Sequence, residues 1–138
     1  MARDLYHNFV RLALEKEGWV ITQDPLYIDL DETYIEIDLA ADMFIAAEKA
    51  GTKIAVEVKS FLGRSIISEF HTAMGQYLDY RDALEEYETD RILFLAIPEE
   101  IYLSSVFQGK FIHRRLQREQ VKLIIVNMAK QTISTWIK

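Results

Sequence analysis

The segment Glu57-Val58-Lys59 places an acid and a lysine two positions apart. Residues 53–59 alternate between apolar and polar types, which predicts a β-strand. Because side-chain direction repeats every two residues along a strand, Glu57 and Lys59 project from the same face. A divalent metal ion would give the carboxylate a partner near a core, where unpaired charges are costly. The lysine would then orient or deprotonate a water molecule, or stabilise charge that develops on a phosphate. The alternative interpretation is a Glu and a Lys on an ordinary half-exposed strand.

A second carboxylate for this metal site is expected from the preceding strand, which offers Asp38 and Asp42. If Ala50-Gly51 is a two-residue turn, Asp42 lies opposite Lys59 and one diagonal step from Glu57. Asp38 would then be roughly 13 Å further along the strand. This register favours Asp42 as the partner of Glu57. Asp38 stays the alternative, because a β-bulge would change the pairing.

Gln76 and Tyr80 are one helical turn apart in the segment with the longest helical pattern, residues 65–87. Residues at this spacing share a helix face. If that face points at the strands, the pair could contact a phosphate or position Lys59. The alternative is a helix surface with a tyrosine packed at its edge.

The other polar candidates have weaker patterns. His7 is a lone histidine on the first predicted helix. His71 and His113 have no Cys or His neighbour at metal-ligand spacing, which counts against a zinc site. The densest basic cluster is Arg114, Arg115 and Arg118. We interpret it as a solvated helix face that is also the best place for contact with nucleic acid or a partner.

These candidate residues are distributed over a pattern of alternating helices and strands, which predicts an α/β fold with a mixed central sheet flanked by helices. No repeat or linker interrupts the chain, so residues 1–138 are predicted to form one domain. The predicted helices are residues 3–17, 65–87, 98–106 and 110–119, and Gly18 is a plausible stop for the first. The predicted strands are residues 19–22, 34–47, 53–59, 91–97, 121–127 and 132–137.

Composition limits the classes of function. Half of the 138 residues are hydrophobic, which is enough for one core, and the absence of cysteine excludes disulfides and thiolate metal sites. No signal peptide or membrane-spanning segment is expected, so we predict a cytoplasmic protein. The net charge of −6 counts against strong nonspecific binding of nucleic acid without a basic partner or a divalent metal.

The acid on one strand, Glu57-x-Lys59 on the next, and the helix with Gln76-x-x-x-Tyr80 together resemble the PD-(D/E)xK nuclease superfamily, which has a restriction-endonuclease-like core. This resemblance implies that Asp42 and Glu57 bind Mg²⁺ or Mn²⁺ and that Lys59 assists the attacking water. His7 occupies the first-helix position where many members have Glu. No proline precedes Asp42 or Asp38, although many members lack it.

More narrowly, the chain resembles the cyanobacterial XisH family of fdxN-element excision controlling factors nearly end to end. The matching stretches include Gly18-Trp19, Asp24-Pro25, the run from Ala46 to Gly51, the run from Ile54 to Phe61, and Gly75-Gln76-Tyr77. The resemblance implies a factor for programmed excision of a DNA element in heterocyst differentiation. Its partners would be DNA, directly or through other proteins, a site-specific recombinase and the companion factor XisI, and it could form a homo-oligomer.

Two hypotheses follow. In the first, the chain is a Mg²⁺-dependent DNA endonuclease specific for a junction or another DNA structure. In the second, it is a regulatory module that controls a recombinase through protein contacts, as the acidic net charge and His7 suggest. We favour a role in excision control, with enzymatic activity open.

Overall fold

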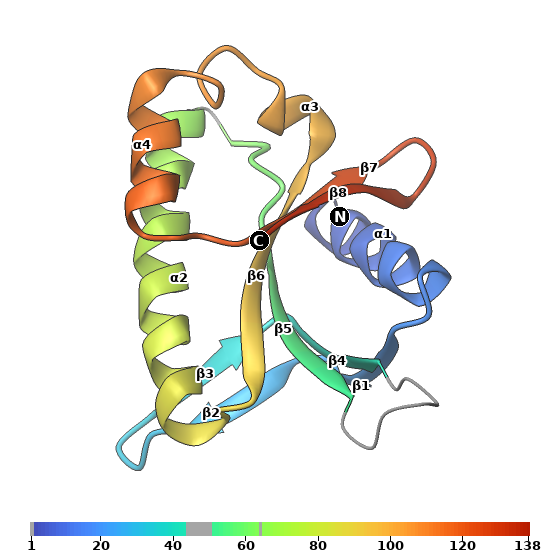
Figure 1. Ribbon diagram of the computed structural model, residues 1–138, viewed down its shortest axis with the longest axis vertical. Coiled ribbons are helices and arrows are strands. Elements are labelled where there is room, and N and C mark those ends of the chain that lie inside the picture. Colours follow the sequence, from blue (N-terminus) through green and yellow to red (C-terminus); the bar gives the residue numbers. More distant parts are fainter. Residues whose placement is uncertain (1, 44–50, 64) are drawn as a thin grey trace.

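The computed structural model describes residues 2–43, 51–63 and 65–138. Its backbone forms four helices and eight strands in these residues (Figure 1). The helices are α1 (Ala2–Lys16), α2 (Ile66–Tyr87), α3 (Glu99–Tyr102) and α4 (Lys110–Arg118). The strands are β1 (Val20–Gln23), β2 (Leu26–Asp29), β3 (Tyr34–Ile37), β4 (Leu39–Met43), β5 (Thr52–Val58), β6 (Arg91–Pro98), β7 (Leu123–Asn127) and β8 (Thr132–Ile137).

A mixed six-stranded sheet with the order β1-β4-β5-β6-β7-β8 forms the centre of the molecule. Strands β5, β6 and β7 run parallel to one another, and the remaining neighbours pair antiparallel. The central strands β6 and β7 are almost continuously apolar because both of their faces are covered. Strands β2 and β3 pair in a separate two-stranded sheet. The predicted α/β class with a mixed sheet flanked by helices is confirmed.

Helices cover both faces of the sheet (Figure 1). Helix α1 packs through Val10 and Leu14 on one face, against residues such as Val56 and Phe94. Helices α2 and α4 and the β2–β3 hairpin lie on the other face. Because strand residues alternate between faces, Ala55 and Glu57 project toward the α2 side. In the part of the chain that the structure describes, every helix is too short or too polar to cross a membrane.

Most predicted elements are confirmed to within a few residues. Gly18 follows the first helix with a φ of 95°, a left-handed conformation that glycine adopts without steric cost. Two differences concern the region before β5. The short strand β2 was not predicted, and the single strand expected over residues 34–47 is instead β3 and β4, separated at Asp38. That strand's last residues, 44–47, lie outside the described residues.

The register predicted for the β4–β5 hairpin is wrong. Asp42 pairs with Lys53 rather than with Lys59, and the last described pair is Met43 with Thr52. Eight residues therefore separate the paired ends of the two strands, so they are not joined by a two-residue turn at Ala50-Gly51. Ala50 itself lies outside the described residues.

Asp42 instead forms a buried ion pair with Arg91 at the start of β6. The Nη1 group of Arg91 donates a hydrogen bond of 2.9 Å to Oδ1 of Asp42 and another of 3.0 Å to the carbonyl oxygen of Ile54. The side chains of Arg91 and Asp42 are only 6% and 10% exposed. The pair therefore connects β4 and β6 across β5, and its role in this structure is architectural.

Asp42→Asn should destabilise the fold, because it leaves the buried charge of Arg91 without a counter-charge. We expect a loss of about 3 kcal/mol in the free energy of unfolding, measured by urea denaturation. Asp90→Asn is the matched control, since Asp90 is 71% exposed and lies 4.0 Å from Lys53. It should change stability by less than about 0.5 kcal/mol. Equal effects of the two substitutions would contradict a structural role for the Asp42–Arg91 pair.

Candidate functional site

Two carboxylates meet where the chain bends between β3 and β4. Asp38 lies at this bend, next to the carboxyl end of β5. The backbone N–H of Val58 donates a hydrogen bond of 2.8 Å to Oδ2 of Asp38. The backbone N–H of Asp38 donates in turn to Oε1 of Glu57, at 3.4 Å. These two hydrogen bonds hold Asp38 and Glu57 side by side. The acid beside Glu57 is therefore Asp38, which was the alternative expected from the sequence.

Burial and a neighbouring charge change the acidity of Glu57. The residue is 5% exposed, and this burial is the main cause that raises the pKa of its carboxyl to about 8. The negative charge of Asp38 raises the pKa further, and the ammonium of Lys59 opposes both effects. Glu57 therefore carries a proton at neutral pH unless a cation takes the place of that proton.

Lys59 lies on the same face as Glu57, as strand parity predicted. Its Nζ is 3.6 Å from Oε2 of Glu57, and its side chain is 25% exposed. The backbone N–H of Lys59 donates to the carbonyl oxygen of Ala96, so β5 and β6 remain hydrogen-bonded up to this residue. The ammonium is therefore held beside the buried carboxyl while it remains accessible to solvent.

Helix α2 brings Tyr80 close to the two carboxylates. Burial is the main cause that raises the pKa of the Tyr80 phenol to about 12, and the charges of Glu57 and Asp38 add to it. Gln76, one turn earlier on the same helix face, has a buried Oε1 that accepts no hydrogen bond from any described residue. An unpaired buried acceptor of this kind could receive a hydrogen bond from a ligand or a water molecule.

The site has an excess of negative charge. Asp79 on α2 and Glu36 on β3 also raise the pKa of Tyr80, so four carboxyl groups influence this phenol. Among the described residues, no group of three or more His, Cys, Asp or Glu side chains is arranged to hold a metal ion. Any cation here would therefore have Asp38 and Glu57 as its protein carboxylates.

His7 and Asp42 are directed toward other partners. His7 Nε2 lies 2.9 Å from Oδ1 of Asp24, and Arg11 donates to the other oxygen of the same carboxylate at 2.7 Å. Asp42 is engaged by Arg91, which the sequence analysis did not single out. A charged residue at the start of a nearly continuous apolar strand is a signal for a buried partner, and it could have revealed this pair.

Glu57→Gln should change how stability depends on pH. The pKa of Glu57 is about 8 in the folded state, above the ordinary value of 4.5. Between pH 4.5 and pH 8 the folded state therefore binds more protons than the unfolded state. The contribution of Glu57 to stability is therefore full below about pH 4.5 and is lost as pH rises to about 8. At pH 8.5 without metal, Glu57→Gln should be more stable than the wild type, by on the order of 2 kcal/mol, and this advantage should vanish near pH 5.

Chemical denaturation over this pH range measures the effect. Glu69→Gln is a suitable control, since Glu69 is also an acid bonded to a backbone N–H, that of Gly63, but lies at an exposed position. A constant difference in stability between the wild type and Glu57→Gln from pH 5 to 8.5 would show that the pKa of Glu57 is not raised.

Comparison with known proteins identifies relatives of the same length. A family model described as XisH protein matches residues 1–134. The crystal structure of an XisH family protein from Nostoc punctiforme PCC 73102 has a TM-score of 0.87 and 44% sequence identity, and the match covers 98% of this chain and 100% of that one. The crystal structure of a fdxN element excision controlling factor protein from Anabaena variabilis has the same TM-score and identity, with 99% and 100% covered. A search of curated proteins gave no match. The chain therefore belongs to the XisH family.

Proposed function

We propose that this chain is a controlling factor for the excision of a DNA element and that Asp38 and Glu57 form its divalent-cation site. The first part is supported by the Anabaena variabilis relative, an fdxN element excision controlling factor that is 44% identical over nearly all of both chains. The second part is supported by one observation above the others, which is the buried carboxyl of Glu57 held next to the half-buried Asp38 and beside Lys59.

The chemistry of the donor atoms fits Mg²⁺ or Mn²⁺. Both are hard cations that prefer carboxylate oxygens, and Mg²⁺ is often bound by one or two carboxylates while it keeps several waters. Asp38 and Glu57 supply this number of carboxylates. A cation would also favour the ionised form of Glu57, because it would compensate the carboxylate charge that burial and the neighbouring Asp38 disfavour.

At such a site a bound cation would polarise a phosphate and lower the pKa of a water molecule. The chain's own groups would do the rest. Lys59 would hold that water or stabilise charge on a phosphate oxygen, since its ammonium lies beside the pair and is solvent-accessible. Gln76 could donate through its amide nitrogen to a phosphate, and the Tyr80 phenol stays protonated at neutral pH and can donate.

We further propose that the core is that of the PD-(D/E)xK superfamily. The order of α1, β1, β4, β5, α2 and β6 supports this, because it is a helix followed by three strands, a helix and a strand. The position of an acid beside Glu57-Val58-Lys59 supports it as well. On this proposal DNA, the companion factor XisI and a site-specific recombinase are the partners of the chain.

A second candidate function is a Mg²⁺-dependent endonuclease that acts on a DNA junction or another DNA structure. The specific observation in its favour is the Lys59 ammonium 3.6 Å from the Glu57 carboxyl, since a nuclease needs a cation next to the attacked phosphate. The excision role does not require that this chain cut DNA itself.

Lys59→Ala tests both functions. In a reporter strain that carries the DNA element and its recombinase, we expect excision to fall by roughly 10²-fold, which is typical for loss of one charge-stabilising group. Lys53→Ala is the matched control, because Lys53 lies on the same face of the same strand, 41% exposed and away from the carboxyl pair. Undiminished excision with Lys59→Ala would overturn a functional role for the site.

The endonuclease candidate is tested with purified protein on junction, nicked, single-stranded and duplex DNA with Mg²⁺ or Mn²⁺. Cleavage that is lost with Lys59→Ala would support it. No cleavage of any of these substrates would overturn the endonuclease and leave the excision role standing.

A further inference from the structure

Basic residues are concentrated in one short segment of this acidic protein. Residues 110–122, which comprise α4 and the turn that follows it, contain 5 of the 16 Lys and Arg residues and 1 of the 22 Asp and Glu residues. The rest of the chain has 11 basic and 21 acidic residues. Such a local reversal of the overall charge is typical of a surface that binds an anionic partner.

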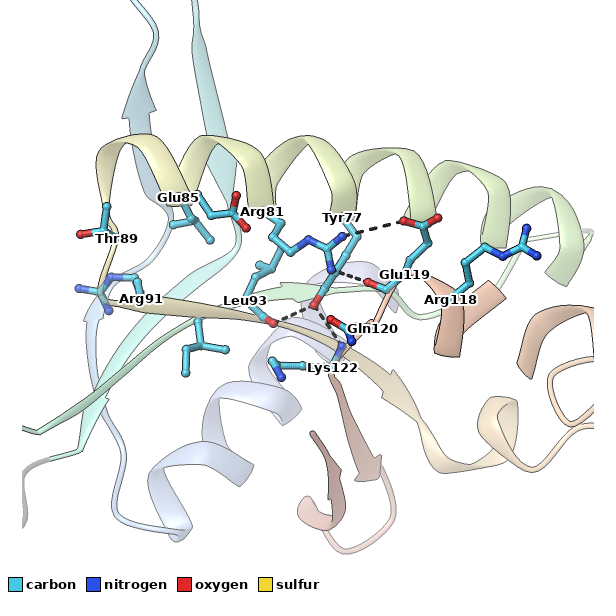
Figure 2. A pocket seen from close by; sticks show the side chains of 12 residues that line it. Tyr77, Arg81, Glu85, Thr89, Arg91, Leu93, Arg118, Glu119, Gln120 and Lys122 are labelled. Carbon is cyan, nitrogen blue, oxygen red and sulfur yellow. Dashed lines mark hydrogen bonds and ion pairs between the residues drawn. The ribbon is translucent and has the colours of Figure 1, made fainter. Parts of the chain in front are cut away.

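A groove of about 500 Å³ adjoins this segment, between α2, the start of β6 and the turn after α4 (Figure 2). Its lining includes four cationic side chains, from Arg81, Arg91, Arg118 and Lys122, and the charge of Arg91 is compensated by the buried Asp42. Only two acids, Glu85 and Glu119, line the same groove. The other three cations against two acids leave the groove with a small excess of positive charge, although the whole chain has a net charge of −6.

The wall of the groove is fixed by a buried tyrosine. The Tyr77 hydroxyl donates a hydrogen bond to the carbonyl oxygen of Leu93 and accepts one from the backbone N–H of Lys122, at 3.0 and 3.1 Å (Figure 2). Arg81 lies over the Tyr77 ring and donates to the carbonyl oxygen of Glu119. These contacts join α2, β6 and the turn after α4, so the wall of the groove and the Arg81 guanidinium are held in place before any ligand arrives.

One flank of α2 is acidic, whereas the two charged residues of the other flank, Arg81 and Glu85, compensate each other. On one flank, Asp79, Asp82 and Glu86 line a separate cavity next to Leu30 and Ile35. The flank that contains Arg81 faces the basic groove instead. Tyr80, whose phenol is influenced by both carboxyl groups, does not line the groove, and neither does Gln76 one turn earlier. The basic groove is thus distinct from the candidate cation site, and helix α2 separates them.

We propose that this groove and the exposed basic face of α4 bind the phosphodiester backbone of a nucleic acid. Arginine forks bind phosphate oxygens in pairs. The aromatic ring that lines the groove, that of Tyr77, is 1% exposed and cannot stack on a base, so the groove itself recognises backbone rather than bases. Helix α4 extends the surface by about 13 Å, which is enough for several phosphates and too long for one small anion.

This inference rests on the proposed function only in the expectation that the nucleic acid is DNA. It adds that this chain contacts the backbone itself, through a surface other than the carboxyl pair. Duplex DNA, single-stranded DNA and RNA share the phosphodiester chemistry, so the experiment compares all three.

The test is fluorescence anisotropy of labelled 20-nucleotide probes with the full chain in EDTA, over a range of salt concentrations. EDTA removes any divalent cation that would hold a phosphate at the carboxyl pair, so binding reports on the basic surface. We expect Arg114→Gln/Arg118→Gln to weaken binding to duplex DNA at least tenfold in 50 mM salt. The slope of the logarithm of the binding constant against the logarithm of the salt concentration should become less steep by about 2, which is the value for loss of two phosphate contacts.

Both arginines are exposed and glutamine is a good helix former, so the variant should fold, and circular dichroism checks this. Lys16→Gln, exposed at the end of α1 on the opposite face of the sheet, should bind like the wild type. Equal binding by the double variant would overturn the inference, as would no binding of any probe at low salt. Binding of polyglutamate without binding of any of the three nucleic acids would also overturn the inference, because it would indicate an acidic protein partner. A failed cleavage or excision assay does not affect this readout.

Discussion

The arrangement of the candidate site depends on a buried carboxyl, that of Glu57, which lies against a second carboxylate. Burial and the charge of Asp38 both disfavour ionisation of Glu57, and together they raise its pKa to about 8. A folded chain keeps such a pair only if a proton, a lysine or a metal ion compensates the charge. Lys59 compensates part of it from 3.6 Å, and a divalent cation would compensate the rest. The cost of burying the Glu57 carboxyl beside Asp38 is thus a reason to expect a ligand.

The backbone creates this pair by an irregularity. A continuous strand from residue 34 to 47 would add one more regular neighbour to β5. The chain instead bends at Asp38, so that β3 leaves to pair with β2 and β4 stays in the main sheet. The bend frees the N–H and carboxylate of Asp38 to bond with Glu57 and Val58 at the end of β5. Helix α2 then separates this acidic region from the basic groove on its other flank.

Much of the fold was predictable because its patterns are local. The amphipathic spacing in α1 and α2, the apolar run of β6 and the stop at Gly18 depend on neighbouring residues, and the structure has each of them. Strand parity placed Glu57 and Lys59 on one face for the same reason. The partner acid was not predictable in this way, because register depends on the length of the β4–β5 connection, which composition does not determine. The favoured Asp42 is occupied by Arg91, a residue from a strand that joins the sheet 49 positions later.

The central claim is that Asp38 and Glu57 hold a divalent cation. Crystals soaked in Mn²⁺ at about pH 8.5, above the pKa of Glu57, test it most directly, because the anomalous signal of manganese locates the ion. We expect one strong peak within about 2.3 Å of oxygens from both Asp38 and Glu57, and its loss in crystals of Asp38→Asn. An empty site at high Mn²⁺ concentration, or a peak at Asp42 in its place, would show that these two residues do not form a cation site.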